Sequence, residues 1–158
     1  MSYFPAASAD FPASAFPTPD LINRRRVLDF DDGSGTATEL CYFSGYLTDT
    51  YGGGGLTIKV IFSAVPTSGA VVWEAAFERL NTDTSADSFD TGNAQTATTT
   101  VSGTANIRVV SSIAFTNGQI DGLLAGEEYR IYLKRLTSSG ADTLVGDASL
   151  SGVSVYEP

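Results

Sequence analysis

Hydrophobic and polar residues alternate with a period of two along most of the chain after its first 26 residues. In the clearest segment, 56–65, Leu56, Ile58 and Val60 share one face, and Lys59 lies on the other. Such alternation is typical of a strand with one buried face. Eight segments are predicted as strands: 27–30, 38–47, 56–65, 70–80, 93–101, 105–115, 128–137 and 143–156.

Three of these segments carry additional information. Residues 70–80 fit a strand and also a helical stripe, and the Pro-Thr-Ser-Gly turn at 66–69 favours a hairpin strand. Residues 38–47 are apolar on both faces, which is typical of a strand covered on both sides. In 143–156 the apolar parity switches, and Ser151-Gly152 is predicted as a β-bulge that absorbs the switch.

Short strands separated by turns rich in Gly, Asn and Asp predict an all-β protein. We expect an antiparallel β-sandwich of about eight strands, jelly-roll-like, over residues 27–158. Residues 117–126 are expected to form a short helical turn that carries Ile120, Leu123 and Leu124 into the core. The 158 residues suffice for one such domain.

Residues 1–26 are predicted to be an extended, proline-rich N-terminal arm, because four of the six prolines lie within the first 20 residues. Phe4, Phe11 and Phe16 are spaced between these prolines, and Arg24, Arg25 and Arg26 follow. A disordered tail is the alternative, but such tails are usually poor in aromatic residues. The arm is therefore predicted to bind a partner through the three rings and the arginine triplet, for which a solvated turn is the alternative.

Composition and charge exclude several functions. The chain has no histidine and one cysteine, which excludes a Ser-His-Asp triad, a His-containing zinc site and an internal disulfide. A net charge of −9 argues against nucleic-acid binding. The sequence contains no apolar run long enough to cross a membrane as a helix, so no membrane partner is expected. We predict no catalytic site, no cofactor and no metal, and hence no enzyme.

Several clusters were weighed before that conclusion. The acidic turn with Asp29, Asp31, Asp32 and Glu39 contains the oxygen ligands that calcium prefers, but its spacing fits an EF-hand loop poorly. The Gly-rich run at 52–55 lacks the Lys-Ser/Thr of a phosphate-binding loop. The other candidates have ordinary interpretations: Glu74 and Glu78 as a solvated face, Cys41 as a buried small hydrophobe, and Trp73 with the tyrosines as core rather than a sugar-stacking platform.

The stretches YGGGGLTIKVIFSA (51–64), TSGAVVWEAAFERL (67–80) and LLAGEEYRIYLKR (123–135) resemble small structural proteins of tailed-bacteriophage particles. This resemblance implies a jelly-roll or related β-sandwich that assembles as a homotrimer. It implies a location in the virion after synthesis in the host cytoplasm. Members of this group decorate and cement capsids or form part of tail fibres, and the proline-rich start resembles the arms of cement proteins.

Our leading prediction is a capsid decoration or cement protein whose arm binds the major capsid protein of the same virion. The second strand, with Tyr42, Phe43 and Tyr46, is the predicted interface strand. The alternative is a tail-fibre or baseplate component that recognises a host surface glycan. That alternative predicts exposed aromatic and carboxylate side chains on loops 48–55 or 81–92. A free carbohydrate-binding module is a third hypothesis.

Overall fold

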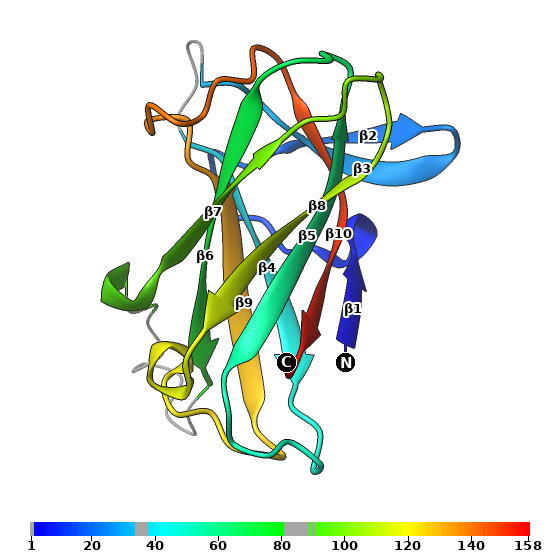
Figure 1. The fold of residues 1–158 in the computed structure, drawn as a ribbon. Coiled ribbons are helices and arrows are strands. Elements are labelled where there is room, and N and C mark those ends of the chain that lie inside the picture. The colour runs from blue at the N-terminus through cyan, green and yellow to red at the C-terminus, as the bar shows by residue number, and fades with distance from the viewer. Residues whose placement is uncertain (1, 34–37, 81–88, 90) are drawn as a thin grey trace.

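The chain folds as two antiparallel sheets packed face to face (Figure 1). The computed structural model describes residues 2–33, 38–80, 89 and 91–158. Among these residues, a six-stranded sheet has the order β2–β3–β10–β5–β8, with β1 also paired to β10. The facing four-stranded sheet has the order β4–β9–β6–β7. The predicted all-β antiparallel sandwich is confirmed.

The eight predicted segments correspond to β3 to β10, and the two further strands come from residues 1–26. Residues 117–126 contain a 3-10 helix, η4, which agrees with the short helical turn expected there. The elements are β1 (Ser2–Pro5), η1 (Ala6–Ser8), β2 (Thr18–Ile22), β3 (Arg25–Phe30), β4 (Leu40–Tyr46), β5 (Leu56–Ala64), β6 (Ala70–Arg79), η3 (Thr91–Asn93), β7 (Gln95–Thr100), β8 (Val109–Phe115), η4 (Asn117–Ile120), β9 (Glu128–Arg135) and β10 (Ala148–Tyr156).

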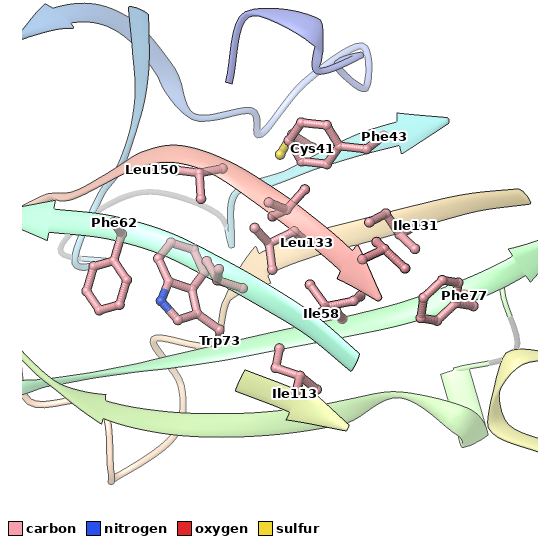
Figure 2. Close-up of a cluster of buried hydrophobic side chains, with 14 of the residues drawn as sticks. Cys41, Phe43, Ile58, Phe62, Trp73, Phe77, Ile113, Ile131, Leu133 and Leu150 are labelled. Carbon is pink, nitrogen blue, oxygen red and sulfur yellow. The ribbon is translucent and has the colours of Figure 1, made fainter. Parts of the chain in front are cut away.

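The core fills the space between the sheets with the inward positions of each strand (Figure 2). Trp73 of β6 lies at its centre and is fully buried. Its ring makes edge contacts with Phe30 at 5.1 Å and Phe62 at 5.4 Å between centroids, which joins the two sheets. Burial of a large apolar side chain contributes roughly 1.5–3 kcal/mol. The predictions that 70–80 is a strand and that Trp73 belongs to the core are confirmed.

The predicted bulge in the last strand is also confirmed. The pairing of β10 with β5 shifts register between Leu150 and Gly152. Leu150 before the shift and Val153 after it both point into the core and are fully buried. The extra residue, Ser151, stays on the outer side of the six-stranded sheet, where it is half-buried.

Residues 2–26 lie along the sandwich rather than apart from it. β1 pairs with β10, and β2 forms a hairpin with β3, so the predicted boundary after residue 26 falls within β3. Pro19 is accommodated because β2 is an edge strand, where a missing N–H does no harm. Asn23 and Arg24, the two hairpin residues, both have positive φ, at 50° and 68°.

The prediction that Leu124 enters the core is wrong, because the chain turns outward after Leu123 and Leu124 is 54% exposed. The predicted strand 105–115 begins too early: β8 begins at Val109, the residues before it form a turn, and Ile107 is 52% exposed. None of the helices in the described ranges is long and apolar enough to span a membrane.

Candidate functional site

Three adjoining hollows lie along the outer side of the six-stranded sheet, and together we call them the trough. The central hollow, about 810 Å³, lies between the β2–β3 hairpin and the residues just before β8. A second hollow, about 370 Å³, shares Arg25, Arg108 and Ser151 with it. A third, about 670 Å³, shares Ile22, Asn23 and Asn106. Because neighbouring hollows share lining residues, the trough is continuous.

The middle of the trough is basic. Arg25 and Arg108 line both the central and the second hollow, and Arg26 lines the second. Within the described residues, none of these three guanidinium groups takes part in an ion pair. Arg25 and Arg26 are exposed at the start of β3, so their donors remain available to a ligand.

Tyr3 supplies an aromatic ring at one end of the trough. It is 56% exposed, lines the second hollow, and its hydroxyl donates to the Ser151 carbonyl at 3.5 Å. The ring crosses the backbone at Gly152, where an added Cβ would lie 2.8 Å from the Tyr3 hydroxyl and 2.6 Å from the Phe4 carbonyl oxygen. The glycine that completes the predicted bulge is therefore also the position over which Tyr3 lies.

The opposite end of the trough is acidic. Asp20, Asp29 and Asp147 line the third hollow together with Asn23 and Ser149. Burial raises the pKa of Asp29, and a hydrogen bond from Ser149 partly opposes this rise. Burial also raises the pKa of Asp147, and neighbouring carboxylates raise it further. Negative charge is thus already crowded at this end.

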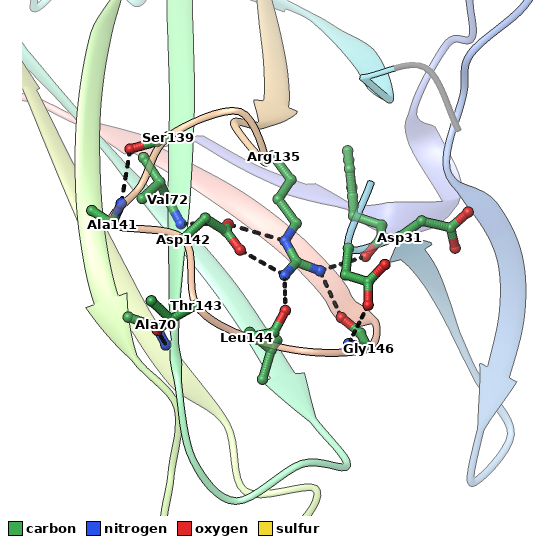
Figure 3. A network of polar contacts seen from close by, with 12 residues as sticks. Asp31, Ala70, Val72, Arg135, Ser139, Ala141, Asp142, Thr143, Leu144 and Gly146 are labelled. Atoms are coloured by element: carbon green, nitrogen blue, oxygen red, sulfur yellow. Dashed lines mark hydrogen bonds and ion pairs between the residues drawn. The ribbon is translucent and has the colours of Figure 1, made fainter. Parts of the chain in front are cut away.

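A buried arginine fixes the loop that carries Asp147 (Figure 3). Arg135 pairs with Asp142 through two contacts, Nη2 to Oδ1 at 2.7 Å and Nε to Oδ2 at 3.1 Å. Its remaining donors reach the carbonyls of Phe30 at 3.1 Å, Leu144 at 2.5 Å and Gly146 at 2.7 Å. All five N–H donors of the guanidinium are therefore used. The interaction ties β9 to the end of β3 and to the residues that close the trough.

The outer face of the four-stranded sheet carries a second cluster, in which the charged side chains form ion pairs, although Glu78 Oε1 is buried without a hydrogen-bond partner among the described residues. Tyr42 stacks on Phe89 at 5.6 Å between centroids, and Phe89 contacts Tyr132 at 5.1 Å. Arg130 lies 5.1 Å from the Phe89 ring and pairs with Glu78 at 2.6 Å. On the same face, the Tyr132 hydroxyl donates to Glu74 at 2.7 Å, and Lys134 pairs with Glu74 at 2.6 Å.

Burial, and then the hydrogen bond to Glu74, raise the pKa of Tyr132. The expectation of a solvated Glu74 and Glu78 face is wrong for Glu78, which is 1% exposed beside Arg130. None of the hollows described above lies on this face. We therefore regard the trough as the stronger candidate site.

The structure places the predicted arm residues against their own chain. Phe4 packs 6.0 Å from Phe43 and 6.5 Å from Tyr129, between ring centroids. Phe11 and Phe16 pair with each other at 5.3 Å and remain about two-fifths exposed, at 41% and 42%. Of the arginine triplet, Arg24 lies at the hairpin turn, and Arg25 and Arg26 line the trough.

The predicted interface strand divides between the two faces of β4. Phe43 is fully buried in the core, whereas Tyr46 is 60% exposed and Tyr42 is half-buried beneath Phe89. The alternation in 38–47 correctly separates these faces. The glycan-recognition alternative predicts exposed aromatic and carboxylate side chains on the loop at 81–92. Most of this loop lies outside the described residues, and Phe89 is its one described aromatic residue.

The acidic turn has internal partners. The Asp31 amide donates to Glu39 at 2.8 Å, and the Gly146 amide donates to Asp32 at 2.9 Å. In the described ranges, His, Cys, Asp and Glu side chains form no group of three or more that could hold a metal ion. Cys41 is fully buried, and burial raises the pKa of its thiol.

Sequence reasoning missed Arg108, Asn106 and Asp147 as members of a site. Asn106 and Arg108 were assigned to a strand, although the chain forms a turn with a positive φ at Asn106. The positive charge of Arg108 is the signal in the sequence that indicates a position at the surface.

Comparison with known proteins relates the fold to carbohydrate-binding modules. The CBM35 of Abf62 from Cellvibrio japonicus has a TM-score of 0.59 at 12% identity, over 99% of this chain and 93% of that one. A Xyl-CBM35 in complex with a glucuronic acid containing disaccharide also scores 0.59, at 11% identity, over 99% and 94%. An isomalto-dextranase of Arthrobacter globiformis complexed with panose scores 0.59 at 16%, over 98% of this chain and 23% of that enzyme.

At these identities, the likeness establishes the fold alone. No protein-family model matches the sequence, and no curated protein matches it significantly. The expectation of a β-sandwich is supported, whereas the resemblance to phage particle proteins gains no support beyond that fold.

The prediction of a capsid decoration or cement protein is overturned by these neighbours, which are carbohydrate-binding modules. The physical basis of that prediction was an arm whose rings gain burial on another subunit. In the structure, Phe4 already gains its burial on Phe43 and Tyr129 of the same chain.

Proposed function

We propose that this protein is a non-catalytic glycan-binding module and that the trough is its binding site. The observation that carries the proposal is the set of groups lining the trough: one exposed tyrosine, unpaired arginines, two asparagines and serines. An aromatic ring packs on the apolar face of a sugar, and amides, hydroxyls and guanidinium groups hydrogen-bond to its oxygen atoms. The carbohydrate-binding modules that share the fold support this assignment.

The shape of the trough favours a chain over a single sugar. Its three hollows follow one another along β3 and β10, and each is bounded by residues from the arm. A deep pocket would enclose one residue of a ligand, whereas a trough continuous over three hollows fits several linked residues.

The proposal is tested by affinity electrophoresis and calorimetry with a panel of neutral and acidic polysaccharides. We expect Tyr3→Ala to weaken binding about tenfold, which corresponds to 1.4 kcal/mol. Tyr46→Ala is the matched control, because Tyr46 has a similar exposure, 60% against 56%, on the opposite sheet. If no polysaccharide binds, or if Tyr46→Ala weakens binding and Tyr3→Ala does not, the trough is not the glycan site.

A further inference from the structure

The basic residues of this acidic protein are distributed unequally between its two sheets. The sequence contains nine arginines and lysines and carries a net charge of −9. Four of the nine, Arg79, Arg130, Lys134 and Arg135, belong to β6 and β9 of the four-stranded sheet and are held in ion pairs. Within the described residues the other five form no ion pair, and they lie on the β2–β3 hairpin, on β5 and before β8: Arg24, Arg25, Arg26, Lys59 and Arg108.

Three of these five unpaired cations line the trough. An arginine that has no carboxylate partner on an acidic protein keeps its full attraction for an external anion. Its planar fork matches the two oxygens of a carboxylate or a sulfate, and such charge-assisted pairs are stronger than neutral hydrogen bonds. Arg25 and Arg108 approach the same two hollows from opposite sides, the first from β3 and the second from the turn before β8. An anionic group bound in these hollows is attracted by both.

The acidic end restricts where that anion can lie. Asp20, Asp29 and Asp147 line the third hollow. Burial, followed by repulsion from Asp31 and Asp29, raises the pKa of Asp147, so this end already holds more negative charge than is favourable. A further anion there is repelled, whereas sugar hydroxyls can donate to the carboxylates.

We propose that the trough selects a glycan in which the negative charge is not continuous. An anionic sugar lies against Arg25 and Arg108, and the uncharged sugars next to it lie between Asn23 and Asp147. This inference rests on the proposed glycan-binding function and names the class of glycan. It makes the two arginines specificity-determining residues and Asp147 a residue that excludes uniformly charged chains.

Three oligosaccharide probes of equal length distinguish the classes in calorimetric titrations. Hyaluronan fragments carry a carboxylate on every second sugar, oligogalacturonate carries one on every sugar, and maltooligosaccharides carry none. We expect the hyaluronan fragments to bind at least tenfold more tightly than either of the others. Polyglutamate, an anion without sugars, serves as a fourth probe and is expected to bind weakly.

Substitutions assign the effect to particular residues. Arg25→Gln and Arg108→Gln are each expected to weaken binding of the alternating probe about tenfold, the factor that corresponds to 1.4 kcal/mol. Arg24→Gln is the matched control, because it removes the same charge from the same hairpin but lines none of the three hollows, and it should change the affinity less than twofold. Asp147→Asn is expected to strengthen binding of oligogalacturonate. Thermal melting of each variant confirms that it is folded.

The outcomes separate this inference from the proposed function. If maltooligosaccharides bind as tightly as hyaluronan fragments and both arginine variants bind normally, selection by charge is refuted while glycan binding stands. If polyglutamate competes as well as the sugars, the arginines form a general anion surface and the inference is wrong. If Asp147→Asn leaves the affinity for oligogalacturonate unchanged, the exclusion by the acidic end is wrong. If none of the three oligosaccharides binds and no polysaccharide of the wider panel binds either, both this inference and the proposed glycan-binding function are wrong.

Discussion

Replacing Arg135 by methionine tests whether the buried ion pair holds the loop at the acidic end of the trough. The substitution keeps the unbranched stem but removes all five donors. The carboxylate of Asp142, whose side chain is 3% exposed, then keeps only the amide of Val72, which donates to it at 3.0 Å. The carbonyls of Phe30, Leu144 and Gly146 lose their partner as well.

The expected loss of stability is large because one charge remains buried without its partner. Removing one member of a buried pair costs about 3–5 kcal/mol, much of it from the uncompensated charge. For a domain of this size, each kcal/mol lowers the melting temperature by about 2–4 °C. A loss of about 4 kcal/mol therefore corresponds to a decrease of about 8–16 °C.

Urea denaturation followed by tryptophan fluorescence measures this loss, because Trp73 is the one tryptophan of the chain and lies in the core. Measuring Asp142→Ala and the double variant as well completes a double-mutant cycle for the Arg135–Asp142 pair. The double variant leaves neither charge unpaired, so its loss should be smaller than the sum of the two single losses by more than about 2 kcal/mol. Additive losses, or a loss below 1 kcal/mol in Arg135→Met, would refute the reasoning.

Three further variants test other parts of the structure. Gly152→Ala places a Cβ 2.6 Å from the carbonyl oxygen of Phe4, so it should displace β1 and lower the melting temperature, which calorimetry measures. Arg24→Gly should raise the melting temperature by a few degrees, because Asn23 and Arg24 both have positive φ in the hairpin turn and glycine adopts this conformation without strain. Asp147→Asn should stabilise the protein at pH 7. Since burial raises the pKa of Asp147, its ionisation is less favourable in the folded than in the unfolded chain, so the gain should decrease as the pH is lowered through this raised pKa and disappear below the ordinary value of 3.8. An equal gain at low pH would contradict this.

The strands of the sandwich were predictable because their signal is local. In a strand the side chains alternate between two faces, so each of the segments from β3 to β10 carries its own evidence in the sequence. The bulge at Ser151 was predictable for the same reason, since it is the one-residue correction that keeps Leu150 and Val153 on the buried face. Errors occur where the alternation no longer corresponds to a strand. Ile107 was assigned to the predicted strand 105–115, but β8 begins at Val109.

The role of the arm was not predictable from the sequence. The sequence indicates that an aromatic ring is stabilised by burial, but it does not indicate whether the ring is buried against its own chain or against another subunit. Phe4 contacts Phe43 of β4 and Tyr129 of β9, residues distant in the sequence. The same burial would arise on another subunit, and the local pattern would look identical. The prediction of cementing relied on that second possibility, and the structure places the contact within the chain.

The trough, too, depends on tertiary contacts that no local pattern contains. β10 pairs along one edge with β3 through Ala148 to Leu150 and with β1 from Gly152 to Val155 (Figure 1). The bulge residue Ser151 lies where one partner ends and the other begins. β1 and β3 therefore diverge at this residue, and Ser151 lines both the central and the second hollow, near Tyr3 and Arg25.

It follows that the arm has a structural role within the sandwich itself. The bulge lets β10 pair along one edge with both β3 and β1. Tyr3 of β1, Asn23 of the β2–β3 turn and Arg25 at the start of β3 form one side of the trough. The other side, with Asn106 and Arg108, belongs to the turn before β8. Neither side forms a binding site alone. Of the proline-spaced rings, Phe4 anchors β1 on Phe43 and Tyr129, and the β2–β3 hairpin positions Arg25 and Arg26 at the trough.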